Sequence, residues 1–168
     1  MTTNVLVAYG TTNGSTAGIA EAVADVLRKE GLTVRTAPAV TVNDLTEFDA
    51  VVVGGALYAG RWHKDARRFV RHHRRALQER PVWLFSSGPL DPSASERDIP
   101  PAPGVRRTVL RLAARDHVTF GGCLEEGAEG RMARMILRSG KGGDFRDFAR
   151  IADWAKQVAA DVTAGSGG

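Results

Sequence analysis

Five short strand-like segments alternate along the chain with four segments whose apolar residues recur at helical spacing. Such alternation favours a parallel sheet covered by helices on both faces. Three of the five segments, at 4–9, 50–53 and 82–85, are mainly apolar runs of the length expected for strands buried on both faces. The segment at 32–36 alternates like an edge strand, and the segment at 117–120 is the last predicted strand. The predicted strands are Asn4–Tyr9, Leu32–Thr36, Ala50–Val53, Val82–Phe85 and His117–Phe120, and the predicted helices span 19–27, 63–78, 105–112 and 148–162.

In an open parallel sheet, ligands bind in the crevice outside the carboxyl ends of the strands. The loops that follow Tyr9, Val53, Phe85 and Phe120 are therefore the candidate site. The chain has 168 residues, no internal repeat and no linker-like segment. We expect one domain over residues 1–164 and a flexible tail over 165–168.

Composition narrows the function classes. Apolar residues at 43% and charged residues at 25% are typical of a globular domain. No apolar run is long enough for a spanning helix, and no secretory signal opens the sequence, so we expect a cytoplasmic protein. The single cysteine, Cys123, agrees with a reducing compartment. A net charge of +4 and a pI near 9.7 make anionic partners plausible without choosing among them.

The loop after the first strand carries the strongest motif, Gly10-Thr-Thr-Asn-Gly-Ser-Thr16. Small and hydroxyl-bearing residues before a helix N-terminus suit a phosphate group. No lysine follows Gly14, as a P-loop requires, and the glycine spacing does not match a dinucleotide fingerprint. The alternative is an ordinary turn in which Ser15 or Thr16 caps the helix.

Behind its Val-Leu-Val-Ala-Tyr strand, this loop resembles the FMN-phosphate loop of flavodoxins. The resemblance implies a flavodoxin-like α/β fold, a three-layer sandwich whose five-stranded parallel sheet has the order 2-1-3-4-5. It also implies FMN as the cofactor, with a deazaflavin left open. The phosphate contacts that it implies are Thr11, Thr12, Asn13, Gly14, Ser15 and Thr16.

Two further loops match the places where flavodoxins contact the flavin ring. Tyr58 and Trp62 are the aromatic candidates for stacking on the ring. For Trp62 the alternative is packing under the next helix, and for the loop after Phe85 it is a plain turn. The ring contacts that the resemblance implies are Ala56, Leu57, Tyr58, Ala59, Gly60 and Trp62 from one loop and Ser86, Ser87 and Gly88 from the other.

The run from 55 to 63 is similar to menaquinone-dependent protoporphyrinogen dehydrogenases, as are the segments 120–124 and 139–143. This similarity implies an FMN-dependent oxidoreductase that oxidises a protoporphyrinogen-type tetrapyrrole and passes electrons to a quinone or another acceptor. The propionates of such a substrate would suit Arg61 and Arg131. No catalytic residue is assigned. The alternative is a non-enzymatic electron carrier that docks to a redox partner.

Other charged and apolar clusters carry weaker predictions. The basic helical face that includes Arg67 and Arg75 is either a solvated surface or a site for an acidic substrate, membrane or partner. No aromatic residues are interleaved with it, so nucleic-acid binding is not expected. The four histidines lack metal-ligand spacing, and we expect no metal. The segment 130–138 is predicted as a short amphipathic helix that covers the flavin or contacts the inner face of the membrane peripherally. The alternative is that it simply packs as part of a crossover connection.

Overall fold

The computed structural model describes residues 3–12, 14–124 and 143–166. Its main sheet has five parallel strands in the order β2-β1-β3-β5-β6, and a short sixth strand, β4, pairs antiparallel with the end of β3. The predicted fold class and strand order are thus confirmed. The strands are β1 (Asn4–Gly10), β2 (Thr33–Pro38), β3 (Ala50–Tyr58), β4 (Arg61–Trp62), β5 (Val82–Ser87) and β6 (Asp116–Phe120).

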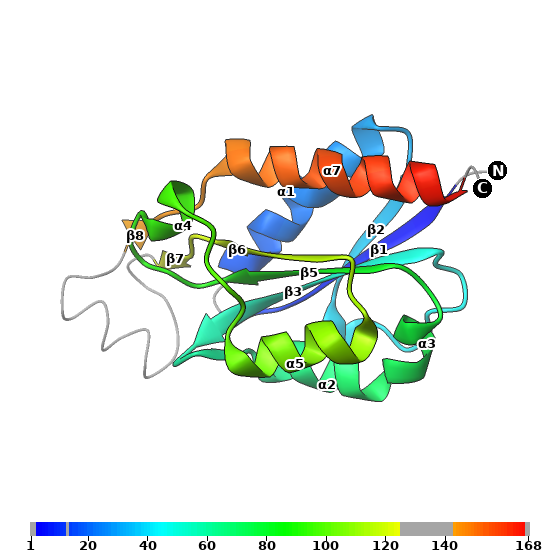
Figure 1. Cartoon of the computed structure of the whole chain (residues 1–168), viewed down its shortest axis with the longest axis horizontal. Coiled ribbons are helices and arrows are strands. Elements are labelled where there is room, and N and C mark those ends of the chain that lie inside the picture. Colours follow the sequence, from blue (N-terminus) through cyan, green and yellow to red (C-terminus); the bar gives the residue numbers. More distant parts are fainter. Residues whose placement is uncertain (1–2, 13, 125–142, 167–168) are drawn as a thin grey trace.

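Helices cover both faces of the sheet (Figure 1). One face carries α1 (Ser15–Lys29) and α7 (Phe148–Ser166), and the other carries α2 (Lys64–His72), α3 (Arg74–Gln78) and α5 (Pro103–Leu112). The smaller elements are η1 (Ala39–Thr41), α4 (Ser93–Glu96), β7 (Cys123–Leu124) and β8 (Gly143–Asp144). The last two pair antiparallel as a separate two-stranded sheet.

Two hydrophobic cores lie on the two faces of the sheet. Successive strand residues point to opposite faces, so Val5 packs with Ile19 and Trp154, whereas Leu6 packs with Phe69. The central strands carry the buried apolar runs 5–8, 50–53 and 82–85, because both of their faces are covered by helices. This packing fixes the carboxyl ends of β1, β3, β5 and β6 along one edge.

The structure differs from the sequence prediction at three boundaries. Strand β3 continues to Tyr58, five residues past Val53, because a hairpin with β4 extends it. The helix predicted over 63–78 is interrupted at His73, which separates α2 from α3. Helix α7 continues to Ser166, so the first two residues of the expected tail are helical. The short elements η1, β4, α4, β7 and β8 are not among the predicted ones.

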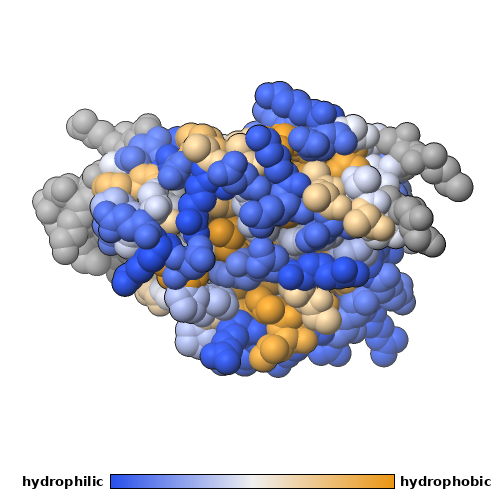
Figure 2. Space-filling model, turned by 45° about the horizontal axis from the view of Figure 1, so that its top comes forward, coloured by the Kyte–Doolittle hydropathy of each residue, from blue (hydrophilic) through white to orange (hydrophobic). Residues whose placement is uncertain are grey.

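The surface is mainly hydrophilic on the face shown in Figure 2, with hydrophobic residues in smaller separate patches. Val40, Leu110 and Phe148 are the large apolar side chains that the described residues expose. Among these residues, no helix combines the length and the apolar character that crossing a bilayer requires. The predicted amphipathic segment 130–138 lies outside the described residues.

Candidate functional site

Four polar or glycine-rich segments meet at the carboxyl edge of the sheet. They are the loop after β1, the β3–β4 hairpin, and the loops after β5 and β6. All lie toward the left of Figure 1, where the strand arrows end. Parallel strands bring these ends together although the segments are far apart in the sequence. The loops predicted to form the ligand site therefore lie along one edge of the sheet.

The loop after β1 ends in an open helix N-terminus. Gly14 is the N-cap of α1, with a left-handed φ of 80°, and as a glycine it has no side chain to accept the first amides of the helix. The first turn of α1 contains no acidic residue. Unpaired amides and the positive end of the helix dipole favour an anion at this place.

Three threonine hydroxyls of this loop have distinct environments. Thr16 is fully buried, and its Oγ1 lies 2.7 Å from the Oγ of Ser87. The Oγ1 of Thr12 lies 2.9 Å from the Nε2 of His63. The Oγ1 of Thr11 is buried and has no hydrogen-bond partner among the described residues. A buried hydroxyl without a partner costs free energy, which a bound acceptor would recover. Asn13, also predicted as a contact, lies outside the described residues.

His63 connects this loop to α2, and it was not among the predicted site residues. Its side chain is 8% exposed and caps α2 by accepting the amide of Asp65 at Nδ1, at 3.1 Å. Burial lowers the pKa of His63 below the ordinary value of 6.5, partly opposed by the carboxylate of Asp65. The imidazole is therefore neutral at neutral pH. The sequence signal was the histidine directly after the β4 strand, within the run already singled out.

The hairpin between β3 and β4 presents the first group of predicted ring contacts. Ala59 and Gly60 both have positive φ, 51° and 76°, which is the signature of a two-residue type I′ turn. Tyr58 is half-buried beside this turn, and its ring meets the His63 ring edge to face at 6.1 Å. Ala56 is buried, whereas Leu57 is half-buried. Tyr58 is thus the predicted aromatic contact that remains near the surface.

Trp62 occupies a packing position. It is 3% exposed, and its ring lies directly over Gly55, where an added Cβ would come within 2.8 Å of it. Its Nε1 donates to the Oγ of Ser86 at 2.8 Å, and the same Oγ lies 2.9 Å from the Nε2 of His117. Of the two interpretations considered for Trp62, this placement favours packing. The side chain of Ser86, engaged by Trp62 and His117, is directed into the core beside α2.

Ser87 and Gly88 complete the edge at the end of β5. Ser87 points to the opposite face from Ser86 and meets Thr16 of the first loop. Gly88 lies against Leu57, where a Cβ would come within 2.8 Å of the leucine Cβ. Its amide donates to the carbonyl of Phe120 at 3.2 Å. These contacts join three of the predicted segments into one cradle.

The donors of this cradle fit a phosphomonoester that carries a planar ring system. Thr11 supplies an unpaired hydroxyl, α1 supplies open amides, and none of the predicted contact residues in the described part is acidic. The half-buried Tyr58 and Leu57 offer apolar surface at the neighbouring hairpin. The residues present therefore fit FMN, whose phosphate needs donors and whose ring needs apolar contact.

This parallel sheet, covered by helices on both faces and with an open helix N-terminus at the strand ends, defines a doubly wound α/β protein. The family model described as flavodoxin domain matches residues 6–139, and the chain therefore belongs to the flavodoxin domain family. It is a flavodoxin-type protein that binds FMN and transfers electrons.

Solved structures share the fold. A flavodoxin of Streptococcus pneumoniae TIGR4 has a TM-score of 0.59 at 18% identity, with 94% of this chain and 99% of that chain covered. A flavodoxin from the domain Archaea has a TM-score of 0.56 at 15% identity, with 91% and 99% covered. The rubredoxin oxygen:oxidoreductase of Desulfovibrio gigas reaches 0.63 at 13% identity over 96% of this chain, which spans only 36% of that longer chain.

Proposed function

We propose that the loop from Thr11 to Thr16 holds the FMN phosphate, and the observation that carries this is the buried hydroxyl of Thr11, which has no hydrogen-bond partner among the described residues. Thr11 donates to a phosphate oxygen, and the open amides at the start of α1 neutralise its charge. Thr12 and Thr16 are held in place by His63 and Ser87. Asn13 and Ser15 complete the proposed set as the remaining polar side chains of the loop.

We propose that the ring lies against the β3–β4 hairpin and the end of β5. FMN, when bound, supplies one- and two-electron redox chemistry, and the protein supplies orientation and electrostatics. Tyr58 and Leu57 exclude water from one side of the crevice. The proposed ring contacts are Ala56, Leu57, Tyr58, Ala59, Gly60, Ser87 and Gly88, with Trp62 and Ser86 supporting the hairpin from beneath it.

In this proposal the protein works as an electron carrier that receives electrons from one redox protein and delivers them to another. No catalytic acid or base is required of the chain for that role. The test is the visible absorption spectrum of the purified protein before and after adding FMN, followed by anaerobic reduction and reoxidation. A protein that stays colourless and ignores FMN would remove the proposal.

A second candidate is oxidation of a protoporphyrinogen-type substrate with a quinone as acceptor. The observation that favours it is the exposed side chain of Arg61 directly beside the flavin-side turn, where it suits a propionate. Arg131, proposed with it, lies outside the described residues. Replacing both with glutamine should raise the KM for protoporphyrinogen while FMN binding is kept. An unchanged KM would remove this second candidate and leave the electron-carrier role as the proposed function.

A further inference from the structure

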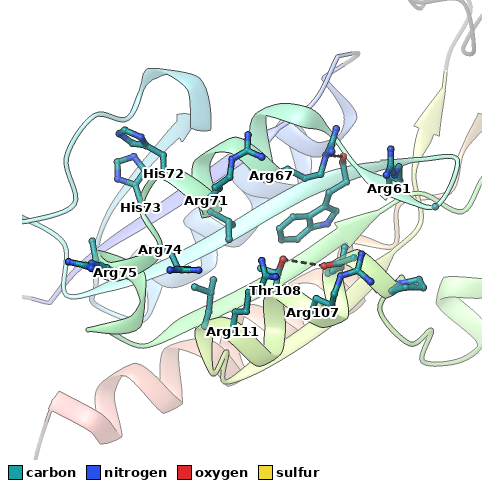
Figure 3. Close-up of a pocket in the computed structure, with 18 residues that line it drawn as sticks. Arg61, Arg67, Arg71, His72, His73, Arg74, Arg75, Arg107, Thr108 and Arg111 are labelled. Carbon is teal, nitrogen blue, oxygen red and sulfur yellow. Dashed lines mark hydrogen bonds between the residues drawn. The ribbon is translucent and has the colours of Figure 1, made fainter.

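An arginine-lined groove runs between α2–α3 and α5, on the face of the sheet opposite α1 and α7 (Figure 3). Its volume is about 1070 Å³, and among the described residues no aspartate or glutamate lines it. The wall residues come from two helical segments and from β4. The arginines of this groove are Arg61, Arg67, Arg71, Arg74, Arg75, Arg107 and Arg111.

These arginines carry uncompensated positive charge. In the described part of the chain, the ion pairs of arginine use Arg28, Arg35, Arg146 and Arg150, and none uses an arginine of the groove. One groove guanidinium is tied to the protein, because the Nε of Arg67 donates to the carbonyl of Trp62 at 3.1 Å. All seven side chains are exposed. Like charges this close repel one another, and a bound polyanion would relieve that repulsion.

The shape and chemistry of the groove favour an extended acidic chain over other anions. Small-molecule pockets bury their ligands in mostly apolar surroundings, whereas here the walls are long exposed guanidinium groups. Single-stranded nucleic acids are held by aromatic side chains on which the bases stack. The one aromatic ring of a tryptophan, tyrosine or phenylalanine on the described walls is Trp62, which is 3% exposed and unable to stack on a base.

The groove is continuous with the flavin-side hairpin. Arg61 belongs to β4, follows the Ala59–Gly60 turn and lies at one end of the groove, and Arg75 lies at the other (Figure 3). A chain bound along the groove therefore ends beside the crevice proposed for FMN. A partner that docks here brings its own redox group close to that edge, where electron transfer needs it.

We propose that this groove docks an acidic segment of the redox partner protein, an inference that rests on the proposed electron-carrier function. The carboxylates of the segment pair with the guanidinium groups of Arg71, Arg74, Arg107 and Arg111, and the segment lies extended between α2–α3 and α5. Binding of this kind is fast and steered by charge, and it weakens as salt rises.

The test uses the full chain and a fluorescein-labelled peptide of alternating glutamate, aspartate and glycine, about 12 residues long. The groove variant is R71Q/R74Q/R107Q/R111Q. Its matched control, R68Q/R97Q/R106Q/R115Q, changes the same charge at exposed arginines outside the groove. Fluorescence anisotropy should show at least tenfold weaker binding by the groove variant and less than about twofold weaker binding by the control, both at low salt.

The outcomes separate this inference from the proposed function. Equal losses in the two variants, or no binding by the unchanged protein, would overturn the groove as a site. Tighter binding of a labelled oligothymidylate of equal charge would replace the acidic partner with a nucleic acid. FMN titrations of all three proteins report the cofactor site independently. If the protein binds FMN but not the peptide, only the groove proposal is overturned. If it binds the peptide but not FMN, the proposed redox role of the partner is overturned.

Discussion

The imidazole of His63 lies between the first loop and the second helix, with its Nε2 2.9 Å from the Oγ1 of Thr12. Because its Nδ1 accepts the amide of Asp65, that nitrogen carries no proton in the neutral ring. The proton therefore sits on Nε2, which donates to Thr12. Since the Oγ1 of Thr12 accepts this bond, its own hydroxyl hydrogen can be donated to another group. The proposed phosphate is an acceptor that suits it.

This relationship predicts two separable effects of replacing His63. His63→Ala removes the cap of α2 and should lower the free energy of unfolding by about 1 kcal/mol. It should also weaken FMN binding about three- to tenfold, because Thr12 loses the bond that orients it. Urea denaturation and FMN titration measure the two effects.

His63→Asn distinguishes the cap from the orienting bond. Asparagine is a good N-cap but is too short to reach Thr12, so it should restore stability and leave FMN binding weak. Full recovery of FMN affinity in the asparagine variant would show that the bond to Thr12 has no part in binding. His72→Asn, at an exposed position of the same helix, is the control.

Thr11→Val should change the free protein and the FMN complex in opposite directions. The hydroxyl of Thr11 is buried and has no partner in the part of the chain that the structure describes, so replacing it with a methyl group should leave the free protein equally stable or stabilise it by up to about 1 kcal/mol. FMN affinity should fall about tenfold, because a phosphate donor is lost. Thr33→Val, at an exposed position in β2, should change neither quantity. Weaker stability together with unchanged affinity would contradict the proposed role.

Much of this fold could be predicted from local sequence. Ala50–Val53 and Val82–Phe85 could be predicted as strands because a strand buried on both faces is a continuous apolar run. The loop that we propose for the phosphate could be singled out for a similar reason: its hydroxyl groups are adjacent in the chain, and the helix follows at once. The turn at Ala59 could not be predicted, because alanine seldom adopts a positive φ. The pairing of β3 with β4 imposes this φ on it.

The rest of the site depends on contacts between distant segments. Ser86 and Ser87 look equivalent in sequence, yet strand alternation sends Ser86 to Trp62 and His117 and Ser87 to Thr16. Which face of β5 meets the crevice is set by where α1 and α2 pack. The environment of Trp62 likewise depends on Gly55, which lies opposite it only after the hairpin has formed.

His117 predicts how stability depends on pH. Burial lowers its pKa from 6.5 to about 4, with Asp116 opposing the shift. Between these values the unfolded chain binds the proton more readily than the folded one, so the free energy of unfolding falls as pH drops from about 6.5 toward 4. Above about pH 6.5 the stabilisation is fully present, because His117 is neutral in both states. The loss attributable to His117 is about 3 kcal/mol.

His117→Gln removes this titration while keeping a neutral hydrogen-bonding side chain near Ser86. The difference between unfolding free energies measured at about pH 7 and about pH 4.5 should shrink by about 2 to 3 kcal/mol. Thr33→Val, at an exposed position in β2, removes no titratable group and should leave that difference nearly as it is in the unchanged protein. If the two variants behave alike, His117 is not the group that couples stability to acid.

A side chain at position 54 should lower the free energy of unfolding, because the Phe85 ring fills the space beside Gly54. A Cβ at this position would lie 2.0 Å from the Cζ of Phe85, so Gly54→Ala should destabilise the protein by about 1 to 3 kcal/mol. Gly104→Ala, in the first turn of α5, meets only the end of Arg107 at 3.7 Å and should be neutral or stabilise by up to about 1 kcal/mol.

Adding Phe85→Leu to Gly54→Ala should cost less than the sum of the single changes, because the smaller side chain frees that space. Strict additivity in urea denaturation would mean that the backbone, and not the ring, excludes the methyl group.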